Sequence, residues 1–294
     1  EGILFLGDSQ HAMIVAVDTK DMEKKEAPKG FKMERIDETI AAMLGVTADK
    51  IKIQDMAVNP ISQSIYLAVQ AQDGTAVLFR TVGDQLEHFA LKEVSYSKSN
   101  LENVPAKDAK DKRGRDLRVW AISDLSFHKN QVLVSGLSNE DFNSTFRAIP
   151  FPFKKDAQYA SLEMYHAAHG RYETKSPIKT FMTYELNGEE YLIASYTCTP
   201  LVVFPMKELK TGAHTKGKTV AELGNRNTPL DIISFEREGE SYLLLANTTR
   251  ALMHIEPKHI ENFQNYLTEP VEEIPGTAGI PFQALPYVNV QQLD

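Results

Sequence analysis

Two histidines three positions apart are the first residues in this sequence that could do chemistry. His166 and His169 lie in the segment His-Ala-Ala-His-Gly, and residues three apart lie on one side of a helical turn. Imidazole is a common ligand of transition metals. The sequence lacks the glutamate of an HExxH zinc motif, so a third ligand would have to come from Glu173, Cys198 or Asp231. The pair predicts a transition-metal site, and histidines that only pack a loop or the surface are the commoner alternative.

Cys198 is the only cysteine in the sequence. A single cysteine can form neither an intrachain disulfide nor a cysteine zinc cluster. A catalytic thiol needs a neighbouring base or cation that lowers its pKa, and residues 196–200 supply neither. We therefore interpret Cys198 as a half-buried structural residue.

Three aspartates occupy similar places in a repeated pattern of strands. Asp55, Asp124 and Asp231 lie at or near the start of a predicted strand, and Thr180 and Asn289 have similar places in other copies. Carboxylates arranged around a channel can hold Ca²⁺, which takes six to eight oxygen ligands. Alternatively, each aspartate caps a turn or accepts hydrogen bonds from main-chain amides. We favour this structural interpretation.

Polar loops add candidates for binding. Arg226, in Gly-Asn-Arg-Asn, is a strong anion donor that could pair with Asp231, and residues 247–250 form a polar turn in the same copy of the repeat. We expect one ligand-binding face to include Asp55, Asp124, Asp231, Arg226, Asn247 and Arg250.

Residues 229–255 give the clearest copy of the repeat. Short β-branched and aromatic runs at 230–235, 242–246 and 251–255 alternate with polar turns, as in an antiparallel meander. Looser copies cover residues 3–17, 51–94, 119–153 and 177–223. The copies begin roughly 50 to 70 residues apart, which is typical of propeller blades rather than helical repeats.

These copies predict an all-β chain that forms a single β-propeller domain, residues 1–294. The count is five blades, and a cryptic strand in 97–116 or 256–286 would raise it to six or seven. We expect a C-terminal strand at 287–293 to pair with the N-terminal sheet and close the ring, which removes exposed edges. Loop insertions are predicted at 19–50, with a short helix at 37–44, at 97–116, and at 159–176, which has room for one strand.

The first strands also carry a resemblance. The segment Gly-Ile-Leu-Phe-Leu-Gly-Asp-Ser at 2–9, followed by Ala-Met-Ile-Val-Ala-Val-Asp at 12–18, resembles secreted bacterial β-propellers of the YVTN and quinoprotein amine dehydrogenase β-chain-like superfamily. The pattern recurs more loosely at 64–80 and 241–255. Such propellers include catalytic, electron-transfer and scaffolding proteins. The resemblance therefore implies the fold of a propeller blade but no particular function.

Composition restricts the function further. The 294 residues carry a formal net charge of -8, which argues against a sequence-independent nucleic-acid binder because such proteins need a basic surface. No apolar run approaches the roughly 18 residues that indicate a membrane span. The sequence starts at Glu1 without a charged and apolar leader, which fits a processed exported protein and equally a sequence trimmed at its start. We expect a periplasmic or extracellular location.

The leading hypothesis is a non-catalytic binding or scaffolding propeller. It would hold a partner protein through a face that carries the long loops 97–116, 159–176 and 223–229, within a redox or envelope assembly. The alternative is a metal-dependent hydrolase or lactonase acting at the axial mouth through Asp55, Asp124 and Asp231. Electron transfer by the chain itself is disfavoured, because the sequence has no CxxCH haem motif.

Overall fold

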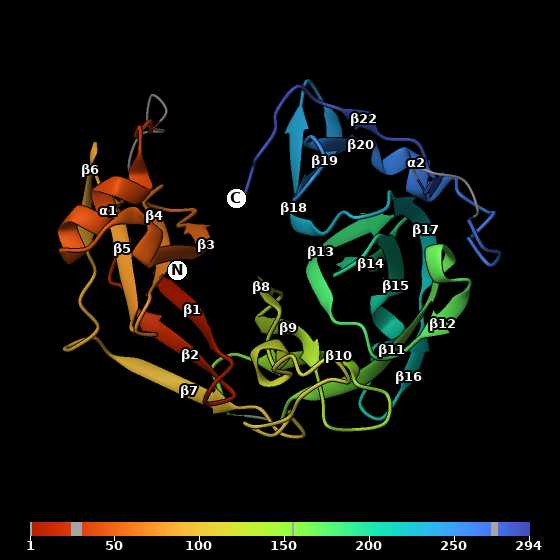
Figure 1. Ribbon diagram of the computed structural model, residues 1–294, viewed down its shortest axis with the longest axis horizontal. Helices are drawn as coiled ribbons and strands as arrows, with labels where there is room; N and C mark the ends of the chain where they lie inside the picture. Colours follow the sequence, from red (N-terminus) through yellow and green to blue (C-terminus); the bar gives the residue numbers. More distant parts are fainter. Residues whose placement is uncertain (1, 25–30, 155, 272–275) are drawn as a thin grey trace. The chain divides into compact units, whose positions relative to one another are not determined.

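The fold is all-β. The computed structural model describes residues 2–24, 31–154, 156–271 and 276–294, and its strands form five mostly antiparallel sheets whose first strands follow one another along the chain (Figure 1). This is the sheet organisation of a five-bladed β-propeller, so the predicted fold class is confirmed. Part of the predicted insertion at 19–50, residues 25–30, lies outside the described residues. None of the described helices has the length and apolar character of a membrane span.

The contacts of the chain fall into two compact units. Unit 1 comprises Glu1–Leu6, Ala16–Ser97 and Asp294, and unit 2 comprises Gly7–Val15 and Lys98–Leu293. The boundary passes through the first sheet. That sheet has the order β1-β2-β7 and contains β1 (Ile3–Asp8), β2 (Met13–Asp18) and β7 (Tyr96–Asn100).

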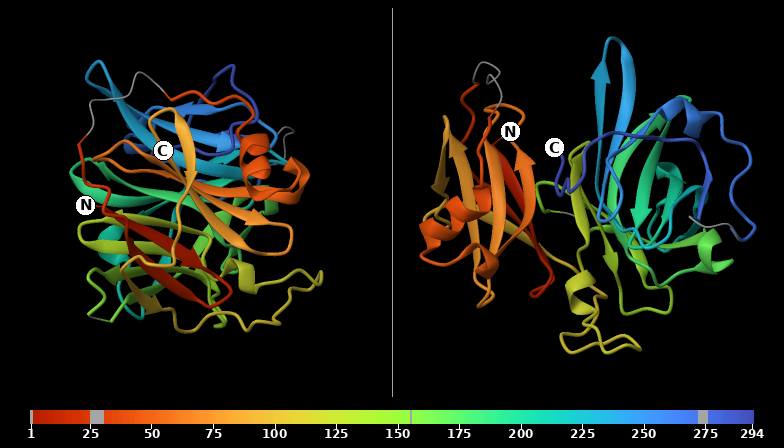
Figure 2. Two further views of the ribbon diagram at one scale, coloured as in Figure 1. Left: turned by 90° about the vertical axis from the view of Figure 1, so that its left-hand side faces the viewer. Right: turned by 45° about the horizontal axis from the view of Figure 1, so that its top comes forward.

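Unit 1 contains the second sheet and the longer helix. The sheet is a meander of β3 (Ile51–Val58), β4 (Ile65–Ala71), β5 (Ala76–Val82) and β6 (Gln85–His88). Helix α1 (Ile36–Leu44) lies against it (Figure 2) and buries Ile40 among Leu67, Val69 and Phe79. The helix ends at Gly45, whose φ of 70° is the left-handed conformation typical of glycine after a helix. The helix predicted at 37–44 is confirmed.

Unit 2 contains three sheets. The third comprises β8 (Asp124–His128), β9 (Gln131–Leu137), β10 (Ser144–Pro150), β11 (Gln158–His166) and β12 (Arg171–Glu173), with β16 (His214–Lys216) parallel to β11. The fourth comprises β13 (Ile178–Leu186), β14 (Glu189–Tyr196), β15 (Pro200–Pro205), β17 (Lys218–Leu223) and β21 (Thr277–Gly279). The fifth comprises β18 (Pro229–Arg237), β19 (Glu240–Asn247), β20 (Met253–Ile255) and β22 (Gln283–Ala284), and the short helix α2 (Pro257–Glu261) follows β20.

The fourth sheet is buried on both faces. One face packs Phe181 and Phe204 against Phe146 of the third sheet, and the other packs Ile193 against Leu243 of the fifth. A strand covered on both sides reads as a continuous apolar run, and every residue of β15 is buried. This packing fixes the strand ends that carry the polar cluster described below.

Several predicted segments differ from the structure. Strand β7 overlaps the segment 97–116 that we predicted as a loop, because a polar edge strand needs only main-chain pairing. The predicted insertion at 159–176 consists largely of strand residues, those of β11 and β12. The copy of the repeat predicted at 119–153 has its first strand only from Asp124, since residues 118–120 form a 3₁₀ turn. Strands β7, β21 and β22 extend existing sheets, so the cryptic strands add no blade.

The predicted C-terminal strand is wrong. Residues 287–293 are in no strand. Asn289 has a φ of 59°, a left-handed conformation that interrupts an extended run. Ring closure by pairing this strand with the first sheet is therefore not observed.

Candidate functional site

The predicted histidine pair lies at the end of β11. His166 is the last residue of that strand and is fully buried, whereas His169 is exposed at the end of a 3₁₀ turn formed by Ala167–His169. Gly170 ends the turn with a φ of 62°. Side chains three positions apart eclipse one another in a 3₁₀ turn, and the two imidazole rings lie 3.8 Å apart between centroids. The structure thus brings the two histidines together.

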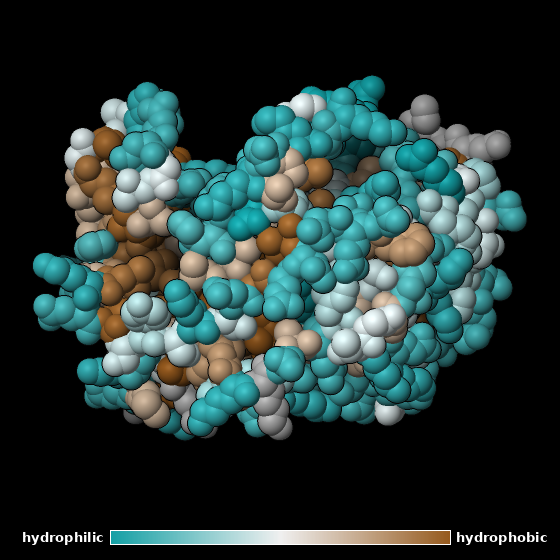
Figure 3. Space-filling view, turned by 90° about the horizontal axis from the view of Figure 1, so that it is seen from below, coloured by the Kyte–Doolittle hydropathy of each residue, from teal (hydrophilic) through white to brown (hydrophobic). Residues whose placement is uncertain are grey.

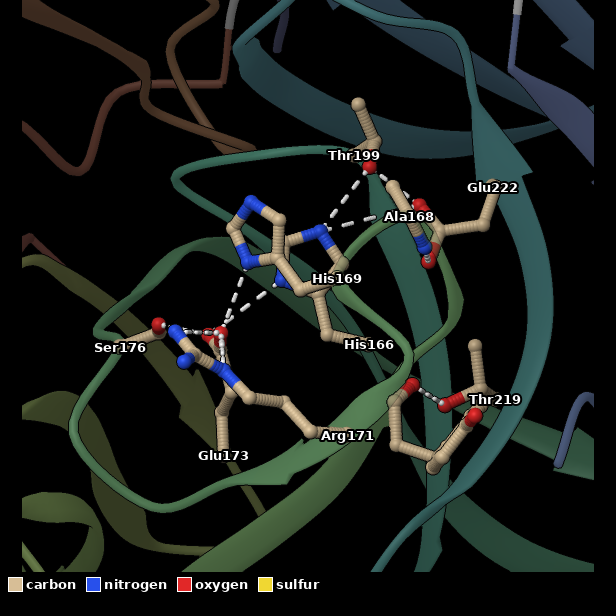
Figure 4. A network of polar contacts seen from close by, with 10 residues as sticks. His166, Ala168, His169, Arg171, Glu173, Ser176, Thr199, Thr219 and Glu222 are labelled. Carbon is tan, nitrogen blue, oxygen red and sulfur yellow. Dashed lines mark hydrogen bonds and ion pairs between the residues drawn. The ribbon is translucent and has the colours of Figure 1, made fainter. Parts of the chain in front are cut away.

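Glu173 joins both imidazoles on one side (Figure 4). Its Oε1 lies 2.8 Å from Nδ1 of His169, and its Oε2 lies 3.3 Å from Nδ1 of His166. Ser176 Oγ donates to Oε2 at 2.7 Å, and the Arg171 guanidinium lies 3.1 Å from Oε1. Burial raises the pKa of the Glu173 carboxyl, but the neighbouring His166 and the hydrogen bonds from His169 and Ser176 outweigh burial and hold this pKa well below its usual range.

A second carboxylate lies on the other side of His166. Nε2 of His166 is 3.2 Å from Oγ1 of Thr199, and the Thr199 hydroxyl donates to Oε2 of Glu222. Glu222 has no exposed surface, and its Oε1 accepts the main-chain N–H of Ala168 at 3.1 Å. A hydroxyl has one proton to donate. Thr199 therefore accepts from His166, which places a proton on Nε2.

Cys198 completes the cluster from the turn between β14 and β15. One ligand atom each of His166, His169 and Cys198 lies within 4.8 Å of the other two. Burial lowers the pKa of His166, but Cys198, Glu173 and Glu222 outweigh burial and raise it to about 9. Of the three candidates for a third ligand, the structure places Cys198 and Glu173 here. Asp231 does not belong to the ligand group found among the described residues.

Two of the predicted aspartates, Asp55 and Asp231, share one local motif with Thr180. The strand register shifts just before Asp55, Thr180 and Asp231, and such a β-bulge re-aims the side chain that follows it. Oδ1 of Asp55 and Oδ1 of Asp231 each accept the N–H of the next residue at 2.9 Å. Asp124, the first residue of β8, does the same at 2.8 Å.

In unit 2 the same side chains link neighbouring segments. Asp124 Oδ2 accepts the N–H of Phe181 at 2.9 Å, which joins the third sheet to the fourth. The Thr180 hydroxyl donates to Asp231 at 3.5 Å, which joins the fourth sheet to the fifth. Asp231 also accepts the N–H of Leu293 at 2.8 Å. The carboxylates of Asp124 and Asp231 therefore act as acceptors for main-chain N–H groups.

The remaining predicted binding residues lie around one pair of loops. Asn247 is buried and its side chain accepts from Asn227 at 2.7 Å, so it holds the loops together. Arg250 is half-buried and donates to the main-chain oxygen of Asn225 at 3.3 Å. Arg226 is exposed. Ligand binding by this face stays a prediction.

A surface that the sequence does not predict forms where β16 pairs with β11. We call it the aromatic-basic surface; it consists of Phe142, Tyr172, His214, Lys216 and the glutamate between them, Glu163. Parallel pairing sets Glu163 opposite Lys216, and a three-residue strand gives no pattern from which that pairing could be predicted. On the face shown in Figure 3 hydrophilic residues predominate, with smaller patches of hydrophobic ones.

The chain matches no protein-family model and no curated protein. Its function therefore has to be inferred from the fold and from these two groups of side chains.

Proposed function

We propose that this chain is a non-catalytic binding protein that holds a partner protein through the aromatic-basic surface. The fold is consistent with a binding or scaffolding role, since propellers commonly present loops from a rigid set of sheets. The observation that carries the proposal is a pair of exposed aromatic rings, Phe142 and Tyr172, that the protein already holds in place.

Each ring contacts a basic side chain that Glu163 holds in place. The Phe142 ring stacks on His214 with centroids 4.2 Å apart, and Nζ of Lys216 lies 4.8 Å from the centroid of Tyr172. Nε2 of His214 and Nζ of Lys216 lie 2.7 and 3.0 Å from the carboxylate of Glu163. Phe142 is 47% exposed and Tyr172 is 51% exposed. Side chains ordered before association lose less entropy on binding, and aromatic residues dominate binding energy at interfaces.

The chemistry of this surface restricts the partner. Lys216 presents a cationic group, and His214 an imidazole, beside the rings of Phe142 and Tyr172, on a chain whose formal net charge is -8. A partner that offers acidic groups beside apolar side chains would complement it. We further propose an exported protein of the YVTN-like propeller class that works in a redox or envelope assembly; the strand pattern at residues 2–18 is what supports this.

The alternative hydrolase or lactonase stays a prediction. Its candidate catalytic residues, Asp55, Asp124 and Asp231, each already accept a main-chain N–H. No observation favours chemistry at these residues over their structural use.

Affinity capture from the native source tests the proposal. The full chain should retain one stable companion, and Phe142→Ala combined with Tyr172→Ala should weaken that binding by at least about 10-fold, since two interface anchors are worth roughly 1.4 kcal/mol or more. Tyr287→Ala is the matched control, because Tyr287 is a 60% exposed ring outside this surface. Recovery of only the free wild-type chain, or equal loss with the control, would overturn the proposal.

A further inference from the structure

We infer that His166, His169 and Cys198 bind a transition-metal ion, with Glu173, Thr199 and Glu222 orienting the ligands. This inference does not depend on the proposed partner. It rests on the convergence of three ligand atoms and on one buried nitrogen whose hydrogen-bonding capacity is unused.

That nitrogen is Nδ1 of His166. It is buried and makes no hydrogen bond to any of the described residues. Glu173 Oε2 lies 3.3 Å away and forms no hydrogen bond with it. The Thr199 hydroxyl donates its proton to Glu222 and can only accept from His166. A neutral His166 therefore carries its proton on Nε2. A metal ion bound at Nδ1, beside the Glu173 carboxylate, would take the place of a second ring proton.

The supporting contacts are those that metal-binding histidines need. A ligating imidazole usually donates its other N–H to a carboxylate or another acceptor, which fixes the tautomer and the orientation of the ring. For His166 the acceptor is the Thr199 hydroxyl, which in turn donates to the buried Glu222. For His169 the acceptor is Glu173, 2.8 Å from Nδ1. Both rings are therefore held by partners outside the ligand group.

The distances between the three ligand atoms would suit a bound metal ion after a small movement of the side chains. The three ligand atoms lie within 4.8 Å of one another, whereas bonds of about 2.0–2.3 Å to a tetrahedral Zn²⁺ bring ligand atoms to roughly 3.4–3.7 Å. The ligand atoms must therefore approach one another by at most about 1.1–1.4 Å. His169, with a side chain 46% exposed, has room to move toward the buried His166.

The ligand types indicate which metal. Two imidazoles and one thiolate suit Zn²⁺ and copper, whereas Ca²⁺ and Mg²⁺ require oxygen ligands. Binding replaces the thiol proton of Cys198, which passes to solvent, with a sulfur–metal bond. The positive ion also offsets the negative charges of Glu173 and Glu222. A fourth position stays open for Glu173 or water.

Metal titration of the full chain tests this inference. The chelator-stripped protein is titrated with Zn²⁺ against a chromophoric chelator, and separately with Co²⁺ to detect a thiolate-to-cobalt charge-transfer band. Because Cys198 is the only cysteine, its reaction rate with a thiol reagent also reports on this site alone. We expect one ion per chain, a thiolate band, and a slower thiol reaction once Zn²⁺ is bound.

Three variants separate this site from adventitious binding. Cys198→Ser should abolish the cobalt thiolate band, and both it and His169→Ala should weaken Zn²⁺ binding by at least about 10-fold, since even supporting residues cost that much. His11→Ala, which removes an exposed histidine that contacts Asp8, should behave as wild type. Failure of the wild type to bind Zn²⁺ and Co²⁺ stoichiometrically, or binding that all three variants leave unchanged, would overturn the inference and leave His166 as the protonated partner of Glu173.

Discussion

Asp124 and Asp231 are polar groups that link packed sheets, as the His166 cluster is a polar group at the end of β11, but the two differ in how many of their polar atoms have hydrogen-bond partners. Asp124 and Asp231 accept main-chain amides on both carboxylate oxygens. His166, fully buried, keeps Nδ1 without a hydrogen bond to the described residues. A buried polar atom without a partner costs free energy, so its presence calls for an explanation that the aspartates do not need.

Among the described residues, the bulge recurs in several sheets, whereas the His166 cluster does not. The bulge motif recurs at Asp55, Thr180 and Asp231, so it belongs to the way these sheets are built. Within the part of the chain that the structure describes, the cluster occurs once, at the end of β11, where a 3₁₀ turn and the short β12 follow the strand. In a repeat protein the feature that occurs once is the better candidate for function.

Removing a recurring aspartate should mainly cost stability. Asp231→Ala deprives the N–H groups of Ile232 and Leu293 of their acceptor, and each unsatisfied group costs about 1–3 kcal/mol when buried. We expect the free energy of unfolding in urea to fall by about 1–3 kcal/mol.

The control for this prediction lies on the same strand. Glu236 is exposed, and Glu236→Ala should change the free energy of unfolding by less than about 0.5 kcal/mol. Equal stability of Asp231→Ala and Glu236→Ala would show that the bulge aspartate does not hold the sheets together.

Glu163 extends the comparison to a polar group that is satisfied and lies near the surface. Burial raises its pKa, but His214 and Lys216 outweigh burial and lower it from the usual 4.5. A carboxylate with a lowered folded-state pKa stabilises the protein above its unfolded-state pKa, and the contribution is lost as the pH falls through the folded-state value.

The expected effect of Glu163 is small. Urea unfolding from pH 7 to pH 3 should show that wild type loses about 0.2–1 kcal/mol more than Glu163→Gln, because the glutamine cannot titrate. Parallel pH profiles for the two proteins would mean that Glu163 does not fix His214 and Lys216.

Much of the fold was predictable because local patterns determine it. Residues 229–255 show three apolar runs separated by turns, and β18, β19 and β20 form there. The polar β7 was missed since its pairing with β2 depends on main-chain groups, which side-chain patterns do not reveal. The expected strand at 287–293 was wrong because apolar alternation cannot show that Asn289 adopts a left-handed conformation.

The candidate site was only half predictable. The spacing of His166 and His169 was visible in the sequence, and Glu173 and Cys198 were among the possible third ligands. The proximity of Cys198 to His166 depends on packing between the third and fourth sheets, which carry them. The roles of Thr199 and Glu222 depend on the same packing, and nothing in the local sequence indicates them.

The Zn²⁺ dissociation constant of two variants tests most directly the distinction between recurring structural residues and the single cluster. For folded Asp231→Ala we predict a value within about twofold of wild type, because Asp231 lies outside the ligand group. For Thr199→Val, which removes the acceptor for Nε2 of His166, we predict a dissociation constant about 10- to 100-fold higher. An equal change in both variants, or a larger one in Asp231→Ala, would contradict the account.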